Sequence, residues 1–397
     1  MSEQPKQICI LGGGFGGLYT ALRLSQLPWE NNQKPSIFLI DKSDRFLFSP
    51  LLYELITSEM QSWEIAPPFV ELLADTSVNF HQGIVTGIDI TNQQIQIDNR
   101  SNLAYDQLVI TMGGQTPIIG IPGAKDHAIP FRTLKDAYKL GEKLRDLEQS
   151  NAEKIRVAVV GGGYSGIEIA CKLADRLGER GRLRIIEKSD MILRNSPDHN
   201  RKAAQKALEK RFIWQDLETN VTEITADSIS LEYKGEITTL PVDIVLWTVG
   251  SQTSDFIANL PLQHNAQKQL TINPFLQAID HPNIYVLGDV ADCQDITGQK
   301  VPATAQVAIQ QSDYCAWNIW ASLNKRPLLP FRYQALGEML TLGIDDATLS
   351  GFGISLDGSA AHLIRRLIYL YRLPTLKHQL NVGLSWITQP ILEMIQH

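Results

Sequence analysis

Two glycine-rich loops with the same spacing occur in distant parts of the chain. They are Gly12-x-Gly14-x-x-Gly17, after apolar residues 8–11, and Gly161-x-Gly163-x-x-Gly166, after apolar residues 157–160. Glycines spaced in this way between a strand and a helix let the backbone approach a pyrophosphate, which the positive N-terminus of the helix stabilises. One such loop is a weak signal because turn glycines are common, but two predict two dinucleotide sites in one polypeptide.

An acidic residue ends the predicted strand that follows each loop. Asp41 has this position after the first loop, and Glu187 has it after the second. A carboxylate there accepts hydrogen bonds from the ribose hydroxyls of a dinucleotide. Glu187 should also repel a 2′-phosphate and favour NADH, but Lys188 and Arg194 lie close enough in sequence to leave NADPH open. Solvated acids at strand ends are the alternative interpretation of both carboxylates.

Two further strand ends carry candidate binding residues. Apolar residues 108–110 lead into Thr111 and Gly113, and apolar residues 284–287 lead into Asp289. Ligands of open α/β sheets bind at the carboxyl ends of the strands, so these residues are placed to contact a cofactor. Asp289 could instead cap the turn that follows it.

Three polar side chains on predicted helices suit proton handling or substrate contact. Glu168 lies just beyond the second loop, in the first turn of its helix, where the helix dipole alone would favour a carboxylate. Gln306 and Gln310 share one face of a long helix that we expect to begin near Pro302 and to run through residues 305–323. The alternative for Glu168 is a carboxylate that is there only because the helix dipole stabilises it. The alternative for the two glutamines is a polar stripe on the surface of the helix.

These positions require strand, loop, helix and strand in succession, and the chain shows that pattern twice, over residues 8–41 and 156–187. Alternating residues at 78–108 predict a β-meander inserted in the first domain. The predicted fold is α/β, with two Rossmann-like dinucleotide-binding domains, as in a flavoprotein that receives electrons from a nicotinamide. The predicted boundaries are 1–118 with 255–330 for the FAD domain, 119–254 for the NAD(P)H domain, and 331–397 for a C-terminal membrane-associating region.

Composition excludes several classes of protein. The chain has 397 residues, of which 44% are hydrophobic and 20% charged, so it suits two or three globular domains. A net charge of −7 argues against a nucleic-acid partner. The first predicted strand begins too early for a secretory signal, and no run of about 18 uncharged apolar residues predicts a transmembrane helix.

The cysteines do not form a recognisable redox or metal motif. Cys9, Cys171, Cys293 and Cys315 include no C-x-x-C pair. This spacing disfavours a metal site and a dithiol centre. We expect reduced and mostly buried thiols.

The C-terminal region predicts an amphipathic, basic helix. Apolar residues line one side, and the other side carries His362, Arg365, Arg366, Tyr369 and Arg372. A second apolar segment follows at residues 382–395. In an acidic protein, such an end suits an anionic lipid surface. Packing on the protein's own core, or on a second copy in a homodimer, would use the same apolar face, and the sequence leaves these alternatives open.

The whole chain resembles a known family. The two loops, their acids and Gly288-Asp289 resemble, in this order, the two-dinucleotide-binding flavoproteins. Three further stretches look like those of type II NAD(P)H:quinone oxidoreductases, most closely the cyanobacterial and chloroplast branch. They are residues 48–54 (FSPLLYE), residues 305–311 (AQVAIQQ) and the basic, aromatic tail.

The resemblance implies FAD as the cofactor and NADH or NADPH as co-substrate. It implies that Asp289 binds the ribityl and phosphate part of the flavin, with Thr111 and Gly113 beside the flavin. It also implies that Glu168 lies near the nicotinamide and flavin, with a part in proton supply or substrate positioning. The helix of Gln306 and Gln310 would pack against the flavin, with Gln306 beside the quinone.

The implied reaction passes two electrons from NAD(P)H through FAD to a membrane quinone, without proton pumping. The quinone would be a naphthoquinone such as demethylphylloquinone, or plastoquinone, and the protein would sit peripherally on the cytoplasmic face of a membrane. Two rival functions remain. A sulfide:quinone or disulfide-type reductase would need cysteines near the flavin, and a nicotinamide-sensing redox regulator would show only slow turnover.

Overall fold

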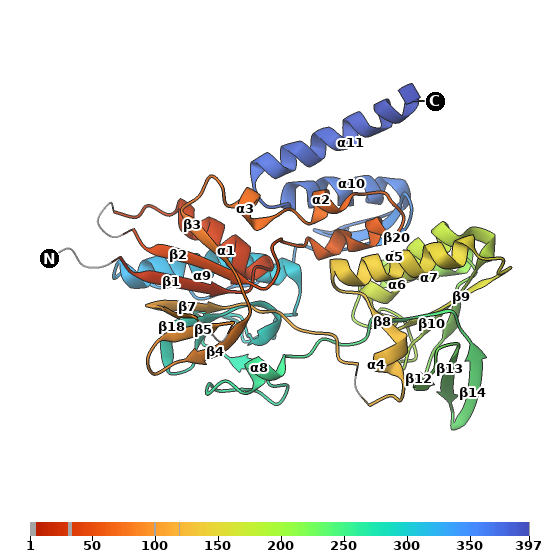
Figure 1. Cartoon of the computed structure of the whole chain (residues 1–397), viewed down its shortest axis with the longest axis horizontal. Coiled ribbons are helices and arrows are strands. Elements are labelled where there is room, and N and C mark those ends of the chain that lie inside the picture. Colours follow the sequence, from red (N-terminus) through yellow and green to blue (C-terminus); the bar gives the residue numbers. More distant parts are fainter. Residues whose placement is uncertain (1–4, 31–33, 99–100, 119, 397) are drawn as a thin grey trace. The chain divides into compact units, whose positions relative to one another are not determined.

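Figure 1 shows the chain as a computed structural model that describes residues 5–30, 34–98, 101–118 and 120–396, without the side chains of Ser101 and of residues 389–396. The chain forms two compact units. Unit 1 comprises Met1–Leu47, Ala66–Gln115 and Ser251–Gln334, and unit 2 comprises Phe48–Ile65, Thr116–Gly250 and Ala335–His397. Residues 48–65 and the C-terminal region thus group with the second nucleotide loop. The functional assignment of the domains stays a prediction.

Unit 1 is built on a six-stranded sheet in the order β17-β18-β7-β1-β2-β3. Its strands are β1 (Gln7–Leu11), β2 (Ser36–Asp41), β3 (Val78–Gln82), β7 (Gln107–Ile110), β17 (Gln277–Ala278) and β18 (His281–Val286). All neighbouring pairs are parallel except β17 with β18. The apolar runs of β1 and β7 are buried because strands inside a parallel sheet are covered on both faces.

The meander predicted over residues 78–108 is shorter than expected. Only β4 (Val85–Asp89), β5 (Gln94–Ile97) and β6 (Ser101–Ala104) form an antiparallel sheet, whereas β3 pairs in parallel with β2. As an edge strand, β3 is half exposed, so its residues alternate like those of a meander strand. The pattern alone does not reveal which strand it pairs with.

The helices of unit 1 include the expected long one. They are α1 (Phe15–Gln26), α3 (Phe69–Leu72), α8 (Asp255–Ala258), the 3₁₀ turn η3 (Gly288–Val290) and α9 (Ala305–Leu323). Unit 1 also contains two short strands, β16 (Leu270–Thr271) and β19 (Ala291–Asp292), which pair in parallel. Helix α9 covers the expected residues 305–323, but it begins later than the predicted start near Pro302. Its N-cap is Thr304, whose hydroxyl accepts from the Val307 amide at 3.3 Å, so Pro302 lies just outside the helix.

Unit 2 repeats the plan with a five-stranded parallel sheet in the order β11-β10-β9-β15-β8. The strands are β8 (Ala128–Pro130), β9 (Ile155–Val160), β10 (Gly181–Ile186), β11 (Trp214–Asp216) and β15 (Ile244–Trp247). The helices and 3₁₀ turns of this part are α4 (Ala124–His127), α5 (Leu134–Gln149), α6 (Tyr164–Leu177), η2 (Gly178–Arg180) and α7 (Asp198–Lys210). The predicted duplication of a dinucleotide-binding α/β fold is confirmed.

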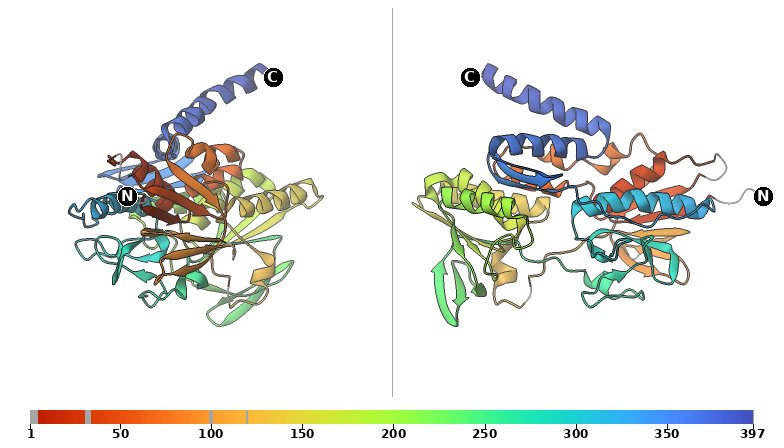
Figure 2. Two further views of the ribbon diagram at one scale, coloured as in Figure 1. Left: turned by 60° about the vertical axis from the view of Figure 1, so that its left-hand side comes forward. Right: turned by 180° about the vertical axis from the view of Figure 1, so that it is seen from behind.

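Two small antiparallel sheets complete unit 2. One contains β12 (Thr219–Ile224), β13 (Ser228–Tyr233) and β14 (Glu236–Pro241), and the other contains β20 (Glu338–Gly343), β21 (Asp346–Gly351) and β22 (Ile354–Asp357). The remaining elements are the 3₁₀ helix η1 (Ser49–Leu55) and the helices α2 (Ser62–Ile65), α10 (Gly358–Arg372) and α11 (Leu376–Gln396). Helix α11 follows α10 after a short turn and runs back over it (Figures 1 and 2).

Helix α10 turns its polar side toward the protein. Its buried residues are Ala361, His362 and Arg365, while Leu363, Leu367, Ile368 and Tyr371 are exposed. The sequence pattern was amphipathic, but it does not say which side of a helix is covered. The structure buries His362 and Arg365 of the basic side, where Glu54 of η1 supplies a counter-charge for Arg365, while Arg366 and Arg372 stay partly exposed. The predicted apolar segment 382–395 lies in α11, and its side chains from residue 389 onward are outside the described residues.

Across the described residues, no helix reaches the length and apolar character that crossing a bilayer requires.

Candidate functional site

The first glycine loop joins β1 to α1 in unit 1. Gly12 has a left-handed backbone (φ +96°), and a Cβ there would lie 2.5 Å from the Thr111 carbonyl oxygen. A Cβ on Gly17 would collide with the Gly12 carbonyl oxygen, so helix and loop can pack this closely only with glycine. Gly14, the N-cap of α1, differs, since a Cβ there would meet nothing within 4 Å. Open space at a helix N-terminus without a side-chain cap is what a pyrophosphate needs.

The second loop, between β9 and α6 of unit 2, has the same geometry. Gly161 is left-handed (φ +112°), and its Cβ would lie 2.7 Å from Thr248 Oγ1. A Cβ on Gly166 would collide with the Gly161 carbonyl oxygen, while Gly163, the N-cap of α6, again faces open space. The two loops therefore share spacing, backbone conformation and the position of the open glycine.

Asp41 and Glu187 hold equivalent positions beside their loops. Asp41 accepts hydrogen bonds from the Gly13 amide at 2.6 Å and the Ser43 amide at 2.7 Å. Glu187 accepts from the Gly162 amide at 2.7 Å and the Ser189 amide at 2.8 Å. Each carboxylate thus faces its loop rather than bulk solvent, which weighs against the interpretation of a merely solvated strand end.

The carboxyl ends of β7 and β18 meet in unit 1. Residues Gly113 and Gly114 follow β7, and a Cβ on Gly114 would lie 3.2 Å from Asp289 Oδ2. Thr111, at the end of β7, lies against both Gly12 and Gly17 of the first loop. The structure therefore brings together the first loop, Thr111, the glycines after it and Asp289. Asp289 lies inside η3, whose N-cap is Leu287.

Gln311 is a residue of this site that sequence reasoning did not single out. It is 1% exposed, and its Oε1 accepts from the Gly288 amide at 2.8 Å, which holds the backbone before Asp289. It also lines a cavity of 240 Å³ at the start of α9, together with Gly288, Cys293, Lys300 and Pro302. The sequence held one indication of its importance, because Gln311 is the last residue of the AQVAIQQ stretch and directly follows Gln310.

Gln306 and Gln310 of α9 both contact the segment that ends unit 1. Gln306 Oε1 accepts from the Tyr333 hydroxyl at 2.9 Å. Gln310 donates to the Gln334 carbonyl at 2.9 Å and accepts from the Gln334 amide at 3.0 Å. Gln310 therefore fixes the backbone at residue 334, which is a structural use of its amide. The predicted shared face is confirmed, and the predicted contact with a quinone stays a prediction.

Glu168 is not in the first turn of its helix, so that expectation was wrong. Helix α6 begins at Tyr164, which puts Glu168 in the second turn, where the dipole interaction has weakened. Its side chain is buried at 7% exposure, and its Oε1 accepts from the Thr341 amide of β20 at 3.0 Å. Burial raises the pKa of the Glu168 carboxyl to about 7, with the Arg365 charge opposing this.

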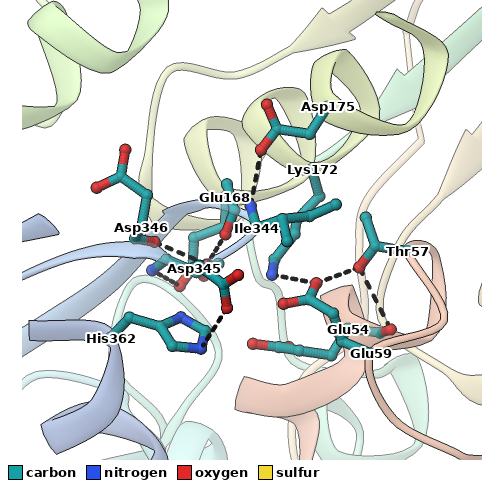
Figure 3. Close-up of polar contacts among 12 residues, drawn as sticks. Glu54, Thr57, Glu59, Glu168, Lys172, Asp175, Ile344, Asp345, Asp346 and His362 are labelled. Atoms are coloured by element: carbon teal, nitrogen blue, oxygen red, sulfur yellow. Dashed lines mark hydrogen bonds and ion pairs between the residues drawn. The ribbon is translucent and has the colours of Figure 1, made fainter. Parts of the chain in front are cut away.

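Glu168 belongs to a buried cluster of charges within unit 2 (Figure 3). Arg365 of α10 is 0% exposed, donates from Nη1 to Glu54 Oε1 at 2.6 Å, and lies 3.8 Å from Glu168 Oε1. Lys172, one turn after Glu168 on α6, is also fully buried and pairs with Glu59. Sequence reasoning missed this cluster because its members are far apart in the chain, and it placed Arg365 on a face for lipid.

The four cysteines are free and buried, as predicted. Burial raises the pKa of the Cys9 and Cys171 thiols to about 12 and that of Cys293 to about 11, and it also raises the pKa of Cys315. Protonated, enclosed thiols are poor nucleophiles. The cysteine chemistry that a disulfide-type reductase would need is therefore not supported.

Comparison with known proteins places this geometry in a family context. The family of pyridine nucleotide-disulphide oxidoreductases matches residues 6–312. The chain is 58% identical to a demethylphylloquinone reductase of Synechocystis, covering 100% of this chain and 99% of the relative. It is 41% identical to an alternative NAD(P)H-ubiquinone oxidoreductase of Arabidopsis thaliana, with 99% and 82% covered.

A solved structure has the same fold. NDH2 from Plasmodium falciparum in complex with NADH superposes with a TM-score of 0.86 at 18% identity, covering 98% of each chain. A sulfide:quinone oxidoreductase from Aquifex aeolicus follows with a TM-score of 0.80 at 20% identity, covering 98% of this chain and 95% of that one. At these identities the likeness establishes the architecture alone.

Proposed function

Because the chain belongs to the pyridine nucleotide-disulphide oxidoreductases, and among them to the type II NAD(P)H:quinone oxidoreductases, we propose that it reduces a membrane quinone with NADH or NADPH through bound FAD. The balanced reaction consumes NAD(P)H, one proton and a quinone, and yields NAD(P)⁺ and the quinol. The observation that carries the proposal is the pair of equivalent nucleotide loops, each with an open N-cap glycine, one in each unit.

Unit 1 would hold FAD. The open side of Gly14 suits the diphosphate, Asp41 is placed for the ribose, and Asp289 and Thr111 line the strand ends where the rest of the cofactor would extend. The 240 Å³ cavity at the start of α9 adds apolar walls and the N-terminus of a long helix. FAD, when bound, supplies the two-electron chemistry. The protein's own residues bind it, orient it and shield it from water.

Unit 2 would hold the nicotinamide coenzyme. Gly163 suits its pyrophosphate, and Glu187 lies where the adenine ribose would come. Glu187 favours NADH by repelling a 2′-phosphate. Arg194, whose guanidinium is paired with Asp190 at 2.6 Å on the surface, keeps NADPH open.

Glu168 would supply one proton to the quinone as it is reduced. A carboxyl whose pKa lies at about 7 can both give and recover a proton at neutral pH. Gln306 would lie beside the quinone, and its carbonyl oxygen already accepts from Tyr333. Gln310 would act one turn away by holding the backbone of residue 334.

Stopped-flow measurement tests the proposal directly. FAD-loaded protein is reduced with NADH and, separately, with NADPH, and is then mixed with a demethylnaphthoquinone, a plastoquinone analogue and a ubiquinone analogue. We expect reoxidation within the turnover time by at least one quinone, fastest for the naphthoquinone or plastoquinone class. Reduction without reoxidation by any quinone would contradict the proposal and favour the redox regulator.

The tail would hold the protein on the cytoplasmic face of a membrane. The apolar residues Leu363, Leu367, Tyr371, Leu376, Leu380, Leu384 and Ile387 of α10 and α11 are all more than half exposed. Lys377 is exposed in the first turn of α11, and Arg366 stacks on Trp386 at 4.3 Å from its ring. An exposed apolar surface next to cations suits an anionic lipid surface.

Vesicle flotation tests this surface. Removing the tail would also take Arg365 away from Glu54, so point variants are preferable. We expect Leu367→Ser, Tyr371→Ser and Leu384→Ser together to abolish flotation with phosphatidylglycerol vesicles. The matched control changes three exposed apolar residues of unit 2 outside the tail: Phe212, Tyr233 and Ile237 to Ser. Unchanged flotation of the tail variant, with loss of a dimer in solution, would assign the face to a second copy.

A further inference from the structure

Arg365 is fully buried and lies between the carboxylates of Glu54 and Glu168. Its Nη1 donates to Glu54 Oε1 at 2.6 Å and its Nη2 donates to the Pro50 carbonyl at 2.9 Å, whereas Glu168 Oε1 is 3.8 Å from Nη2. The guanidinium is therefore engaged by η1 and only approaches Glu168. Among the described residues, Glu54 Oε2 and Arg365 Nε are buried without a hydrogen-bond partner.

The charges around this arginine nearly balance. Arg365 pairs with Glu54, and Lys172 pairs with Glu59, so Glu168 is the carboxylate left over. The cluster is neutral when Glu168 carries a proton and has one net negative charge when it does not. In a buried site that excess charge is unfavourable, so the arrangement favours proton uptake by Glu168.

We propose that Glu54 is a positioning residue for Glu168, because it holds the Arg365 guanidinium and thereby keeps that cation from pairing closely with the Glu168 carboxylate. The proposal rests on the proposed quinone reduction, to which Glu168 supplies a proton. Glu54 touches neither substrate nor cofactor in this scheme. It acts by deciding how much of one cation's charge reaches Glu168.

The other groups around Glu168 do not replace this effect. They come from every element packed on it: Tyr53 and Glu54 of η1, the Thr341 amide of β20, Arg365 and Tyr369 of α10, and Tyr164, Cys171 and Lys172 of its own helix. Arg365 is the nearest cation, since Lys172 is paired with Glu59. Burial opposes ionisation of Glu54, but the Arg365 and Lys172 charges hold the pKa of the Glu54 carboxyl below its usual value. Glu54 therefore stays charged and keeps its hold on Arg365.

Two substitutions should move the proton affinity of Glu168 in opposite directions. Glu54→Gln keeps an oxygen that can accept from Arg365 but removes the competing charge, so Arg365 becomes available to Glu168 and the midpoint should fall by about one pH unit or more. Arg365→Met removes the cation and leaves two carboxylates close together, so the midpoint should rise. A purely structural role predicts weaker folding in both variants and no such opposition.

The experiment is a pH titration of full-length, FAD-loaded protein by difference infrared spectroscopy. The protonated carboxyl C=O band that disappears in Glu168→Gln identifies Glu168. Glu64→Gln is the matched control, because Glu64 is a buried carboxylate of the same segment that contacts α11 instead. Glu54→Asp should return the midpoint toward the native value.

The expected result is a lower midpoint in Glu54→Gln, a higher one in Arg365→Met and no change in Glu64→Gln. An unchanged or raised midpoint in Glu54→Gln would overturn the proposal. Should Glu54→Gln not fold, the Arg365→Met measurement decides, and the absence of an upward movement there has the same meaning. Because this readout needs no quinone, failure of quinone reduction with the midpoints moving as expected would contradict only the proposed function.

Discussion

At Gly14 and Gly163, the missing Cβ atom leaves open space beside each nucleotide loop. Both are helix N-caps, and both have open space where a side chain would start. Their neighbours Gly17 and Gly166 are glycine for another reason, since a Cβ there would strike the loop's own backbone. Two glycines of each motif thus differ: a Cβ at one would clash with the loop, whereas the other leaves open space that we propose for the pyrophosphate.

Exchanging the two open glycines for alanine should separate the two sites. Gly163→Ala should raise the KM for NAD(P)H about tenfold or more, equivalent to about 1.4 kcal/mol, with FAD content unchanged. Gly14→Ala should instead lower FAD content, because the added methyl group occupies the space for its pyrophosphate. Absorbance of bound flavin and steady-state kinetics measure both effects. Equal effects of the two variants on both ligands would contradict the assignment of one ligand to each unit.

Glu168 should give stability a measurable pH dependence. Its pKa rises from 4.5 in the unfolded chain to about 7 in the folded protein, so the folded state binds the proton more tightly. The resulting stabilisation is complete below pH 4.5 and is lost as pH rises to about 7, by about 1–3 kcal/mol in total. Chemical denaturation of the native protein and of Glu168→Gln should show this difference over that range. Parallel curves would mean that folding does not shift the pKa of Glu168.

At the scale of elements, the segment Phe48–Ile65 anchors both tail helices. Glu54 of η1 holds Arg365 of α10. Glu64 of α2 is 1% exposed, and its Oε1 accepts from Ser385 Oγ at 2.8 Å and from Trp386 Nε1 at 3.0 Å of α11. The contacts with buried carboxylates leave the apolar sides of both helices facing outward.

Replacing Glu64 should loosen α11 without disturbing the nucleotide loops. Hydrogen bonds to a charged group contribute about 1.5–3 kcal/mol, and Glu64→Ala also leaves the Trp386 indole N–H without its acceptor. We expect faster proteolytic cleavage within α11 and weaker vesicle flotation, at unchanged FAD content. Glu71→Ala, which removes an exposed carboxylate of α3, is the control and should behave like the native protein. If α11 of Glu64→Ala is cleaved no faster than that of the native protein, its apolar contacts are sufficient to hold it in place.

At the scale of the whole molecule, one supersecondary plan is used twice. Each unit has a parallel sheet, a glycine loop and an acid after the next strand. All four cysteines are buried, and none of them forms a disulfide. We therefore expect electron transfer by this chain to depend on bound dinucleotides rather than on thiols.

Thiol labelling of the whole protein tests that dependence. Because burial raises the pKa of Cys9 and Cys171 to about 12, less than about one thiol in a thousand is ionised at neutral pH. We expect almost no reaction of the native protein with iodoacetamide, and reaction of all four cysteines after denaturation. Rapid native labelling of Cys293, which lines the cavity of unit 1, would revive the sulfide-type alternative.

The parts of the fold that follow from local sequence were predictable. Helix α9 covers the predicted residues 305–323, although it does not begin at Pro302, and the βαβ units appear at the expected residues, because periodicity and glycine spacing are properties of neighbouring residues. The pairing of β3 with β2 and the helical turn that contains Glu168 were not. Strand pairing joins distant residues, and a helix start shifts by a residue or two with the loop before it.

The sequence by itself determined the two nucleotide loops, their acids, the duplicated α/β plan and the family. Each of these lies in a short stretch whose chemistry depends on spacing along the chain. Only the tertiary structure decided which side of α10 faces outward. In it Arg365 is buried and pairs with Glu54 instead of facing a lipid surface. Amphipathicity tells that a helix has two sides, but the side that is buried depends on the charges and shapes of residues that the fold brings from elsewhere.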